Sequence, residues 1–192
     1  MCARFLFNWK RIFIVILAGI FLTVSVLFTA ILVQKKFVYP LKYFEDITVA
    51  AKTYSLDMAL ILAVIKTESA FDESAVSKAG AKGVMQITEK TAEYIAKMKG
   101  DAEYDLFNAT NNIDYGCYYL RYLINRFENL QTALCAYNAG EGRVSSWLKN
   151  AEYSKDGNTL KVIPFEETRE YLNKIKKSFS KYKNLYGNIL DK

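Results

Sequence analysis

Residues 58–71 read MALILAVIKTESAF, and this stretch decides how the rest of the chain can be interpreted. Its first eight residues are all apolar, which is typical of a helix buried in a protein core. In a helix over 58–69, Val64 and Ile65 lie one turn before Glu68, on its own face. That position holds the Glu68 carboxyl against hydrocarbon, which disfavours the charged form and raises the pKa. The stretch therefore predicts a core helix that ends in a candidate general acid.

The alternative for Glu68 is an ordinary solvated side chain. It follows Lys66 near a helix end, and charged residues in such places usually point into water. Composition weighs on this choice, because the chain of 192 residues contains no histidine. The absence of histidine excludes Ser-His-Asp and Cys-His nucleophile systems and metal sites with imidazole ligands. Proton transfer must then be carried out by carboxylate, tyrosine or lysine side chains.

Two cysteines, Cys117 and Cys135, fall within apolar helical patterns. They are too few and too widely spaced for a zinc site. Buried free thiols are predicted in preference to a disulfide, which export would permit. The sequence predicts neither a metal site nor a cofactor.

Hydrophobic periodicity predicts a mainly α fold, because no β-alternation extends beyond a few residues. Asp57 and Thr88 are candidate N-caps, and Gly100 is a candidate helix stop. A loop is expected over 70–87 and a turn at 154–158. Helices are expected at 41–54, 58–69, from Thr88 to 99, and at 130–137, 141–148 and 165–186. A further helix is expected to follow the polar residues 105–112 and to run through residue 127.

The N-terminal region carries 22 consecutive uncharged, mostly apolar residues, from Ile12 to Val33. That length is enough to cross a bilayer, and it exceeds the apolar core of a cleavable signal peptide. We therefore predict an uncleaved single-pass anchor over 12–33, after a short cytoplasmic tail over 1–11. Basic residues on the two sides nearly balance, so the positive-inside rule orients the helix only weakly. An extracytoplasmic C-terminal domain is preferred mainly because of the function inferred below.

The charge of the remaining chain is mild. The chain has 26 basic and 20 acidic residues. Three of the basic residues and none of the acidic ones precede position 35, so the remainder carries a net charge of +3. Such a balance suits work near anionic membranes or wall polymers and predicts no nucleic-acid binding.

Four blocks of sequence resemble the catalytic domain of the soluble lytic transglycosylases, which is related to goose-type lysozyme. The resemblance covers roughly residues 55–180 in family order. The blocks are Glu68-Ser69-Ala-Phe71 with Ala75, Ser77, Gly80-Ala81, Gly83-Val-Met-Gln-Ile87 and Thr91-Ala92; Asp105, Asn112-Ile113, Gly116 and Tyr119-Leu120; Ala133-Leu-Cys-Ala-Tyr137-Asn138-Ala-Gly140 with Gly142, Val144 and Trp147; and Ile163-Pro164, Glu167-Thr168-Arg169 and Tyr171.

The resemblance implies cleavage of the β-1,4 bond between N-acetylmuramic acid and N-acetylglucosamine in peptidoglycan. In this family the muramic C6 hydroxyl attacks its own anomeric carbon and leaves a 1,6-anhydro end. One glutamate, here Glu68, acts first as acid and then as base. The substrate's N-acetyl group replaces a second carboxylate, and nothing in the sequence marks Asp72 or Glu73 as inward-facing.

Five further residues match substrate-binding positions of the family. Ser77 and Gln86 resemble residues that hold sugar hydroxyl or acetamido groups. Tyr137 and Asn138 resemble a sugar-contacting pair, and Tyr137 could also hydrogen-bond Glu68. Glu167 resembles a glutamate near the cleft.

Each of these positions also has a purely structural reading. Ser77 could cap a turn, Tyr137 could belong to the core, Asn138 could end a helix, and Glu167 could favour the first turn of its helix.

One departure from the family pattern concerns the site. Thr88-Glu89 stands where the family often has Met-Pro, which removes an apolar sugar contact and adds a carboxylate near the cleft. A second departure, Leu106 where proline is common, is expected to be harmless.

The sequence thus predicts a lysozyme-like α-helical catalytic domain over 55–186 behind a transmembrane helix, with a stalk and first helix over 34–54 and a C-terminal tail over 187–192. The expected partners are peptidoglycan glycan strands, the membrane, and cell-wall or secretion machinery. A hydrolytic, lysozyme-like muramidase and a non-catalytic wall-binding module remain the alternatives.

Overall fold

A computed structural model describes residues 9–191, and it divides the chain into two compact units that meet between Pro40 and Leu41. Most of the cytoplasmic tail expected over 1–11 lies outside the described residues.

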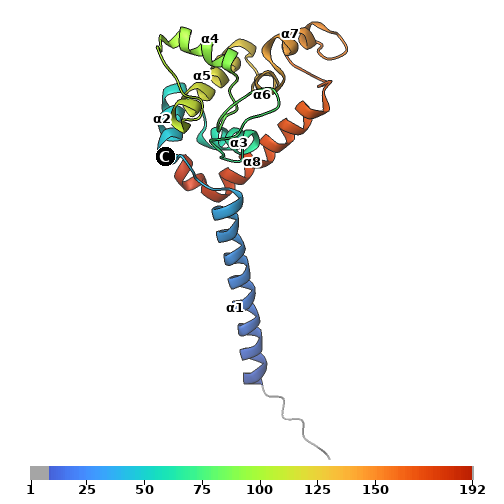
Figure 1. Ribbon diagram of the computed structural model, residues 1–192. Helices are drawn as coiled ribbons and strands as arrows, with labels where there is room; N and C mark the ends of the chain where they lie inside the picture. The colour runs from blue at the N-terminus through green and yellow to red at the C-terminus, as the bar shows by residue number, and fades with distance from the viewer. Residues whose placement is uncertain (1–8, 192) are drawn as a thin grey trace, which may run out of the picture. The chain divides into compact units, whose positions relative to one another are not determined.

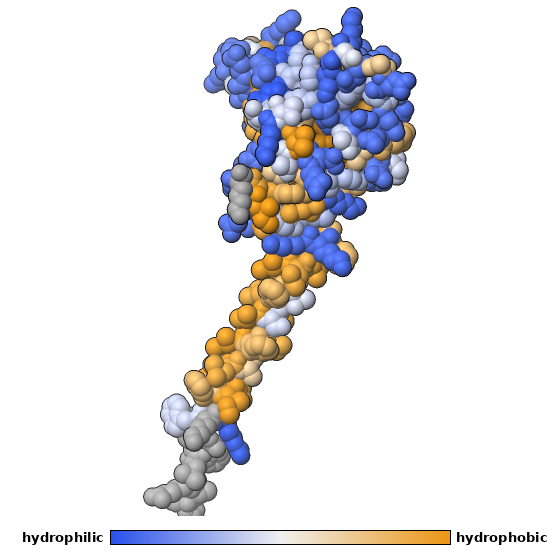
Figure 2. Space-filling model, turned by 90° about the vertical axis from the view of Figure 1, so that its left-hand side faces the viewer, coloured by the Kyte–Doolittle hydropathy of each residue, from blue (hydrophilic) through white to orange (hydrophobic). Residues whose placement is uncertain are grey.

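The first unit is a long exposed helix, α1 (Trp9–Val33), which continues into a π-helical segment, η1 (Gln34–Val38). Figure 2 shows α1 as an almost continuous apolar column. The segment Arg11–Val38 is long and apolar enough to cross a membrane, and none of its most apolar window is buried within the protein. The predicted anchor over 12–33 falls inside this segment, as the length argument requires.

Over residues 41–191, the second unit is built from seven helices, whose arrangement Figure 1 shows. Within residues 9–191 no strand is formed, and only isolated β-bridges join Val76 to Lys82, Lys82 to Ile87 and Ser154 to Leu160. The predicted mainly α class is therefore confirmed. The helices are α2 (Phe44–Tyr54), α3 (Met58–Glu68), α4 (Glu89–Lys99), α5 (Ala109–Phe127), α6 (Leu130–Ala139), α7 (Glu141–Lys149) and α8 (Glu166–Leu190).

Helix α3 lies at the centre of this unit, and every residue from Ala59 to Ile65 is buried. Its main packing partner is α8, which lies across it (Figure 1). A helix that is apolar on all sides needs cover on all sides, which explains why α8 carries a buried stripe that includes Tyr171, Ile175 and Tyr182. The expectation of a core helix before Glu68 is confirmed.

The predicted helix ends agree with the observed ones to within a few residues, and local contacts explain where the helices begin and end. The side chain of Asp57 accepts a hydrogen bond from Ala59 N at 2.8 Å, and that of Thr88 accepts one from Thr91 N at 3.2 Å. Gly100 ends α4 with φ +78°, a conformation that glycine adopts without strain. Helix α8 runs one turn beyond the expected end at position 186, because Leu190 continues its buried stripe.

Two buried clusters flank α5. One joins it to α6 and α7, and the other joins it to α4. Tyr119 and Tyr137 pack against both clusters, so they lie at the seam between them. Cys117 and Cys135 are buried free thiols, as predicted.

Candidate active site

Glu68 is the last residue of α3, and the chain turns sharply after it. Ala70 and Phe71 both have left-handed backbones, with φ of +53° and +69°. Ser69 secures this turn, because its hydroxyl donates to Val84 O at 2.9 Å and accepts from Phe71 N at 3.1 Å. Non-glycine residues in this conformation store strain, which occurs most often at functional sites. The turn leads the 70–87 loop back to the end of α3.

The Glu68 side chain is half-buried, so one part stays accessible while protein surrounds the carboxyl. This burial raises the pKa of Glu68 from 4.5 to about 7, and the nearby Tyr171 hydroxyl partly offsets the increase. A carboxyl with such a pKa is protonated in a large fraction of molecules at neutral pH. The predicted rise in the pKa of Glu68 is therefore confirmed, and its cause is the loss of water around the charge.

Two tyrosines face Glu68, and only one of them was a candidate. Burial raises the pKa of both Tyr137 and Tyr171 well above the ordinary value, and the Glu68 charge raises both further. The Tyr137 hydroxyl donates to Met85 O at 2.9 Å, so the suggested hydrogen bond to Glu68 was wrong. Tyr171 is the second tyrosine beside Glu68. Among residues 9–191 its buried hydroxyl has no partner within normal hydrogen-bond geometry, yet it approaches Glu68 closely enough to lower the glutamate's pKa.

Asn112 holds the loop that faces Glu68. It is fully buried, and its side-chain oxygen accepts from Met85 N at 2.7 Å. Its side-chain nitrogen donates to Lys82 O and Leu106 O, both at 2.9 Å. Gly83 lies against this amide, because a Cβ on Gly83 would come within 2.3 Å of the Asn112 nitrogen. The glycine permits a contact that no other residue would allow.

Gln86 has a left-handed backbone with φ +53°. Its side-chain nitrogen donates to Ala75 O at 3.1 Å and to Gly83 O at 2.9 Å. The amide is thereby oriented, and its oxygen remains the atom that could accept a hydrogen bond from a sugar.

The Ser77 hydroxyl accepts from Ala81 N at 3.0 Å and organises a surface turn. This is the structural alternative foreseen for Ser77, and a contact with substrate remains a prediction.

Asn138 and Glu167 belong to opposite sides of the α6–α8 contact. The side-chain oxygen of Asn138 accepts from Thr168 Oγ1 at 2.8 Å, and Thr168 is buried. Glu167, the preceding residue, is exposed in the first turn of α8, where a negative charge suits the helix N-terminus. The structure therefore ties Asn138 to α8, and it gives Glu167 a structural role beside its predicted contact with sugar.

The Thr88-Glu89 departure is built into the helix start. Thr88 caps α4, and Glu89 in its first turn pairs with Lys82 Nζ at 2.8 Å. The extra carboxylate, Glu89, thus forms an ion pair with Lys82 of the loop that Asn112 supports.

No second carboxylate shares the position of Glu68 in the contacts that the structure defines. Asp72 is exposed and accepts from Ser74 N and Oγ, which lowers its pKa. Glu73 accepts from the Tyr43 hydroxyl at 3.3 Å. Within residues 9–191 no group of three or more His, Cys, Asp or Glu side chains could hold a metal ion. The arrangement can supply one proton donor and acceptor beside oriented amide and phenol groups.

Sequence reasoning placed Tyr171, Asn112 and Thr168 in the family blocks but assigned them no role in this arrangement. Tyr171 had a signal, because its place on the α8 stripe predicts burial, but burial alone does not indicate which residue it faces. Asn112 and Thr168 are polar residues whose burial depends on tertiary contacts that one sequence does not reveal.

Comparison with known proteins places this arrangement in a family. The sequence model described as "Transglycosylase SLT domain" matches residues 45–160. The soluble lytic murein transglycosylase of Salmonella typhimurium is 33% identical over 155 residues, covering 78% of this chain and 24% of that protein. The membrane-bound lytic murein transglycosylase C of Haemophilus ducreyi is 32% identical over 171 residues, covering 75% of this chain and 46% of that protein.

Solved structures agree with the sequence comparison. The 70 kDa soluble lytic transglycosylase of Escherichia coli matches with a TM-score of 0.67 and 29% identity, over 78% of this chain and 25% of that one. An inactive Glu-to-Gln mutant of the lytic transglycosylase Slt from Pseudomonas aeruginosa matches with a TM-score of 0.65 and 29% identity, over 76% and 24%. The chain thus spans about a quarter of the length of these soluble relatives.

Proposed function

Because this chain belongs to the family of transglycosylase SLT domains, we propose that it is a peptidoglycan lytic transglycosylase. It cleaves the β-1,4 bond between N-acetylmuramic acid and N-acetylglucosamine and leaves 1,6-anhydro ends. The observation that carries this proposal is the half-buried Glu68, whose pKa of about 7 makes both protonation states available at neutral pH.

The reaction needs one group that first gives and then takes a proton. Protonated Glu68 donates its proton to the glycosidic oxygen as the bond to the anomeric carbon breaks, so the leaving sugar departs as an alcohol. The substrate N-acetyl group stabilises the electron-poor carbon. The resulting Glu68 carboxylate then takes the proton of the muramic C6 hydroxyl as that oxygen bonds to the anomeric carbon. Glu68 ends protonated, and no water is consumed.

The surrounding residues would position Glu68 and the sugar. Tyr171 approaches the Glu68 carboxyl and favours its charged form after the first proton transfer. Gln86 offers an oriented amide oxygen, and Tyr137 offers a phenol ring beside the carboxyl. Asn138, Ser77 and Glu167 remain proposed sugar contacts.

Product analysis tests the reaction type. The detergent-solubilised full chain is incubated with purified cell walls, and the released muropeptides are measured by mass spectrometry. Anhydro ends support the proposal, whereas reducing ends would identify a hydrolytic muramidase. Binding to walls without released products would identify a non-catalytic wall-binding module.

A matched variant tests the site. Glu68→Gln keeps the shape of the side chain but cannot donate the proton, so activity should fall to background while the melting temperature stays at or above that of the parent chain. Full activity in this variant would refute the role of Glu68.

The anchor belongs to the same proposal. We place α1 across the cell membrane as a single span. The catalytic domain then lies on the extracytoplasmic side, where the glycan strands lie. Cell-wall or secretion machinery would position the domain there. The length and apolar composition of Arg11–Val38 support the membrane span, and the extracytoplasmic side follows from the proposed substrate. Protease added to intact spheroplasts should digest the C-terminal domain, and its complete protection would reverse the orientation.

A further inference from the structure

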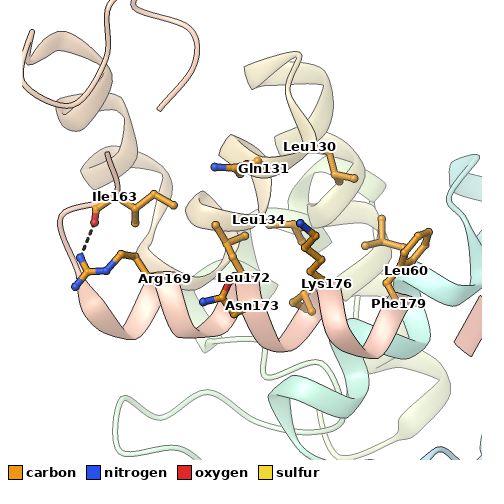
Figure 3. A pocket seen from close by; sticks show the side chains of 11 residues that line it. Leu60, Leu130, Gln131, Leu134, Ile163, Arg169, Leu172, Asn173, Lys176 and Phe179 are labelled. Atoms are coloured by element: carbon orange, nitrogen blue, oxygen red, sulfur yellow. Dashed lines mark hydrogen bonds between the residues drawn. The ribbon is translucent and has the colours of Figure 1, made fainter. Parts of the chain in front are cut away.

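A groove between α6 and α8 is lined by apolar side chains and contains none of the six candidate site residues. It encloses about 600 Å³. Figure 3 shows Leu130 and Leu134 on the α6 side, facing Leu172 and Phe179 on α8, with Leu60 of α3 beside Phe179. Three helices thus contribute to one concave surface.

This surface is more apolar than an ordinary solvent-exposed one. Leu134 and Leu60 at its floor are buried, whereas Leu130 is 46% exposed and Leu172 and Phe179 are half-buried. Single exposed leucines are common on proteins and need no explanation. Several that converge on one hollow mark an interaction site more often.

The charge around the groove has one sign. Its charged lining residues are Arg169 and Lys176, and no acidic residue lines it. The Arg169 guanidinium donates to Ile163 O at 2.7 Å, as Figure 3 shows, and also to Pro164 O at 2.9 Å. Lys176 is exposed and makes no ion pair among the residues that the structure describes. A positive rim favours an acidic partner.

The length of the groove sets the size of its occupant. Leu172 and Phe179 are seven residues apart on α8, which corresponds to about 10 Å or two helical turns. Gln131 and Asn173 add exposed amides between the two walls, where they can bond polar groups of a ligand (Figure 3). We propose that this groove binds an amphipathic helix of a partner protein, with apolar residues at i, i+3 or i+4, and i+7, and acidic residues beside them.

A flat lipid surface matches this shape less well, because the apolar side chains lie within a hollow between α6 and α8. A contact of two turns buries little area and gives a weak, reversible complex. The docked helix would bring the catalytic domain to its place of action without entering the Glu68 site. The proposal does not depend on the catalytic reaction.

The test uses the full chain in nanodiscs of phosphatidylcholine and a fluorescent synthetic peptide. The probe is a helical peptide of about 14 residues, with leucines at i, i+3, i+4 and i+7 and flanking glutamates; its twin carries lysines in place of the glutamates. Fluorescence anisotropy should report saturable binding of the acidic peptide and at least about tenfold weaker binding of the twin.

Two substitutions on α8 make a matched pair. Lys176→Glu reverses a charge at the groove and should weaken binding at least about tenfold. Lys181→Glu makes the same change on an exposed residue of the same helix outside the groove, and it should weaken binding less than about twofold. Leu130→Ser, at a half-exposed position, should also abolish binding without lowering the melting temperature.

Several results would overturn the proposal. These are no saturable binding of the acidic peptide, equal binding of the twin, or equal losses from the two lysine substitutions. Displacement of the peptide by phosphatidylglycerol nanodiscs, with no effect of phosphatidylcholine ones, would assign the groove to lipid headgroups. Self-association that is lost in Lys176→Glu would assign it to a second copy of the chain.

Discussion

Replacing Glu68 with glutamine should stabilise the folded chain, by an amount that depends on pH. The folded-state pKa of Glu68 is raised from 4.5 to about 7 by burial. Below pH 4.5 the carboxyl is protonated in both the folded and the unfolded chain. Between pH 4.5 and about 7 the unfolded chain releases the proton and the folded chain retains it, so the free energy of unfolding falls as pH rises. Above about pH 7 the penalty is constant, and glutamine removes it.

The interval from 4.5 to about 7, at 1.36 kcal/mol per pH unit, corresponds to about 3 kcal/mol. Because Glu68 is only partly buried, solvent screening reduces this value, and we expect about 1–3 kcal/mol at pH 8. For a domain of this size each kcal/mol changes the melting temperature by about 2–4 °C. The glutamine variant should therefore melt about 3–10 °C above the parent chain at pH 8 and at nearly the same temperature at pH 4.

Differential scanning calorimetry of the two chains between pH 4 and 8.5 provides the measurement. Subtracting one curve from the other cancels the groups that the two chains share. Glu103→Gln, which removes an exposed carboxylate, serves as the control for the same chemical change outside the site. A flat difference for Glu68→Gln, or one that is larger at low pH, would refute the argument that burial sets the pKa of Glu68.

Three further predictions concern the groups around Glu68. The rate of wall digestion should fall as pH rises through about 7, because the Glu68 carboxyl must be protonated to donate. Tyr171→Phe should move this decline to higher pH, because it removes the hydroxyl that lowers the pKa of Glu68. An unchanged pH–rate profile in this variant would argue against the contact between Tyr171 and Glu68. Asn112→Leu removes the side-chain partners of the buried Met85 N and Leu106 O, at about 1–3 kcal/mol each, whereas Lys82 O keeps its bond from Ile87 N at 3.0 Å. The chain should therefore unfold at a much lower urea concentration and lose kcat, and a midpoint within error of the parent would contradict the loop-holding role. Gly83→Ala should strongly lower the free energy of unfolding, because the new Cβ would lie 2.2 Å from Leu106 O. Gly100→Ala has a similar φ but open space around the new Cβ, so in the same urea titration it should lower the free energy of unfolding by only about 1 kcal/mol.

The sequence predicted the parts of this molecule that depend on local patterns. The apolar run before Glu68 indicated a core element because eight consecutive apolar residues need cover on all sides, and Asp57 before it, as an N-cap candidate, indicated that this element is a helix. Asp57 and Thr88 marked helix starts because each satisfies a backbone N–H within a few residues of itself. The partner of Glu68 could not be predicted in the same way, because Tyr171 is more than a hundred residues away and its direction depends on how α8 crosses α3.

Resemblance to the family identified positions but not bonding partners. It selected Tyr137 as a neighbour of Glu68, and Tyr137 does lie close enough for the glutamate charge to raise its pKa. Its hydroxyl nevertheless bonds Met85 O, a backbone atom that no motif specifies. Ser77 and Asn138 likewise take protein partners, Ala81 and Thr168. A substrate at these positions would have to share or replace those bonds.

The remaining question is how one carboxyl can serve a reaction for which most glycosidases use two. A two-carboxylate enzyme separates the roles by giving each group its own pKa. Here the carboxylates of Asp72 and Glu73 contact Ser74 and Tyr43, so in the proposed reaction Glu68 would change role between the two steps. A pKa near 7 allows this, because the free-energy difference between its protonated and charged forms is then small at neutral pH. Burial holds the proton for the first step, and the Tyr171 hydroxyl lowers the cost of the charge that the second step requires. In the proposed reaction, the opposing effects of burial and Tyr171 would let a single glutamate act as both acid and base.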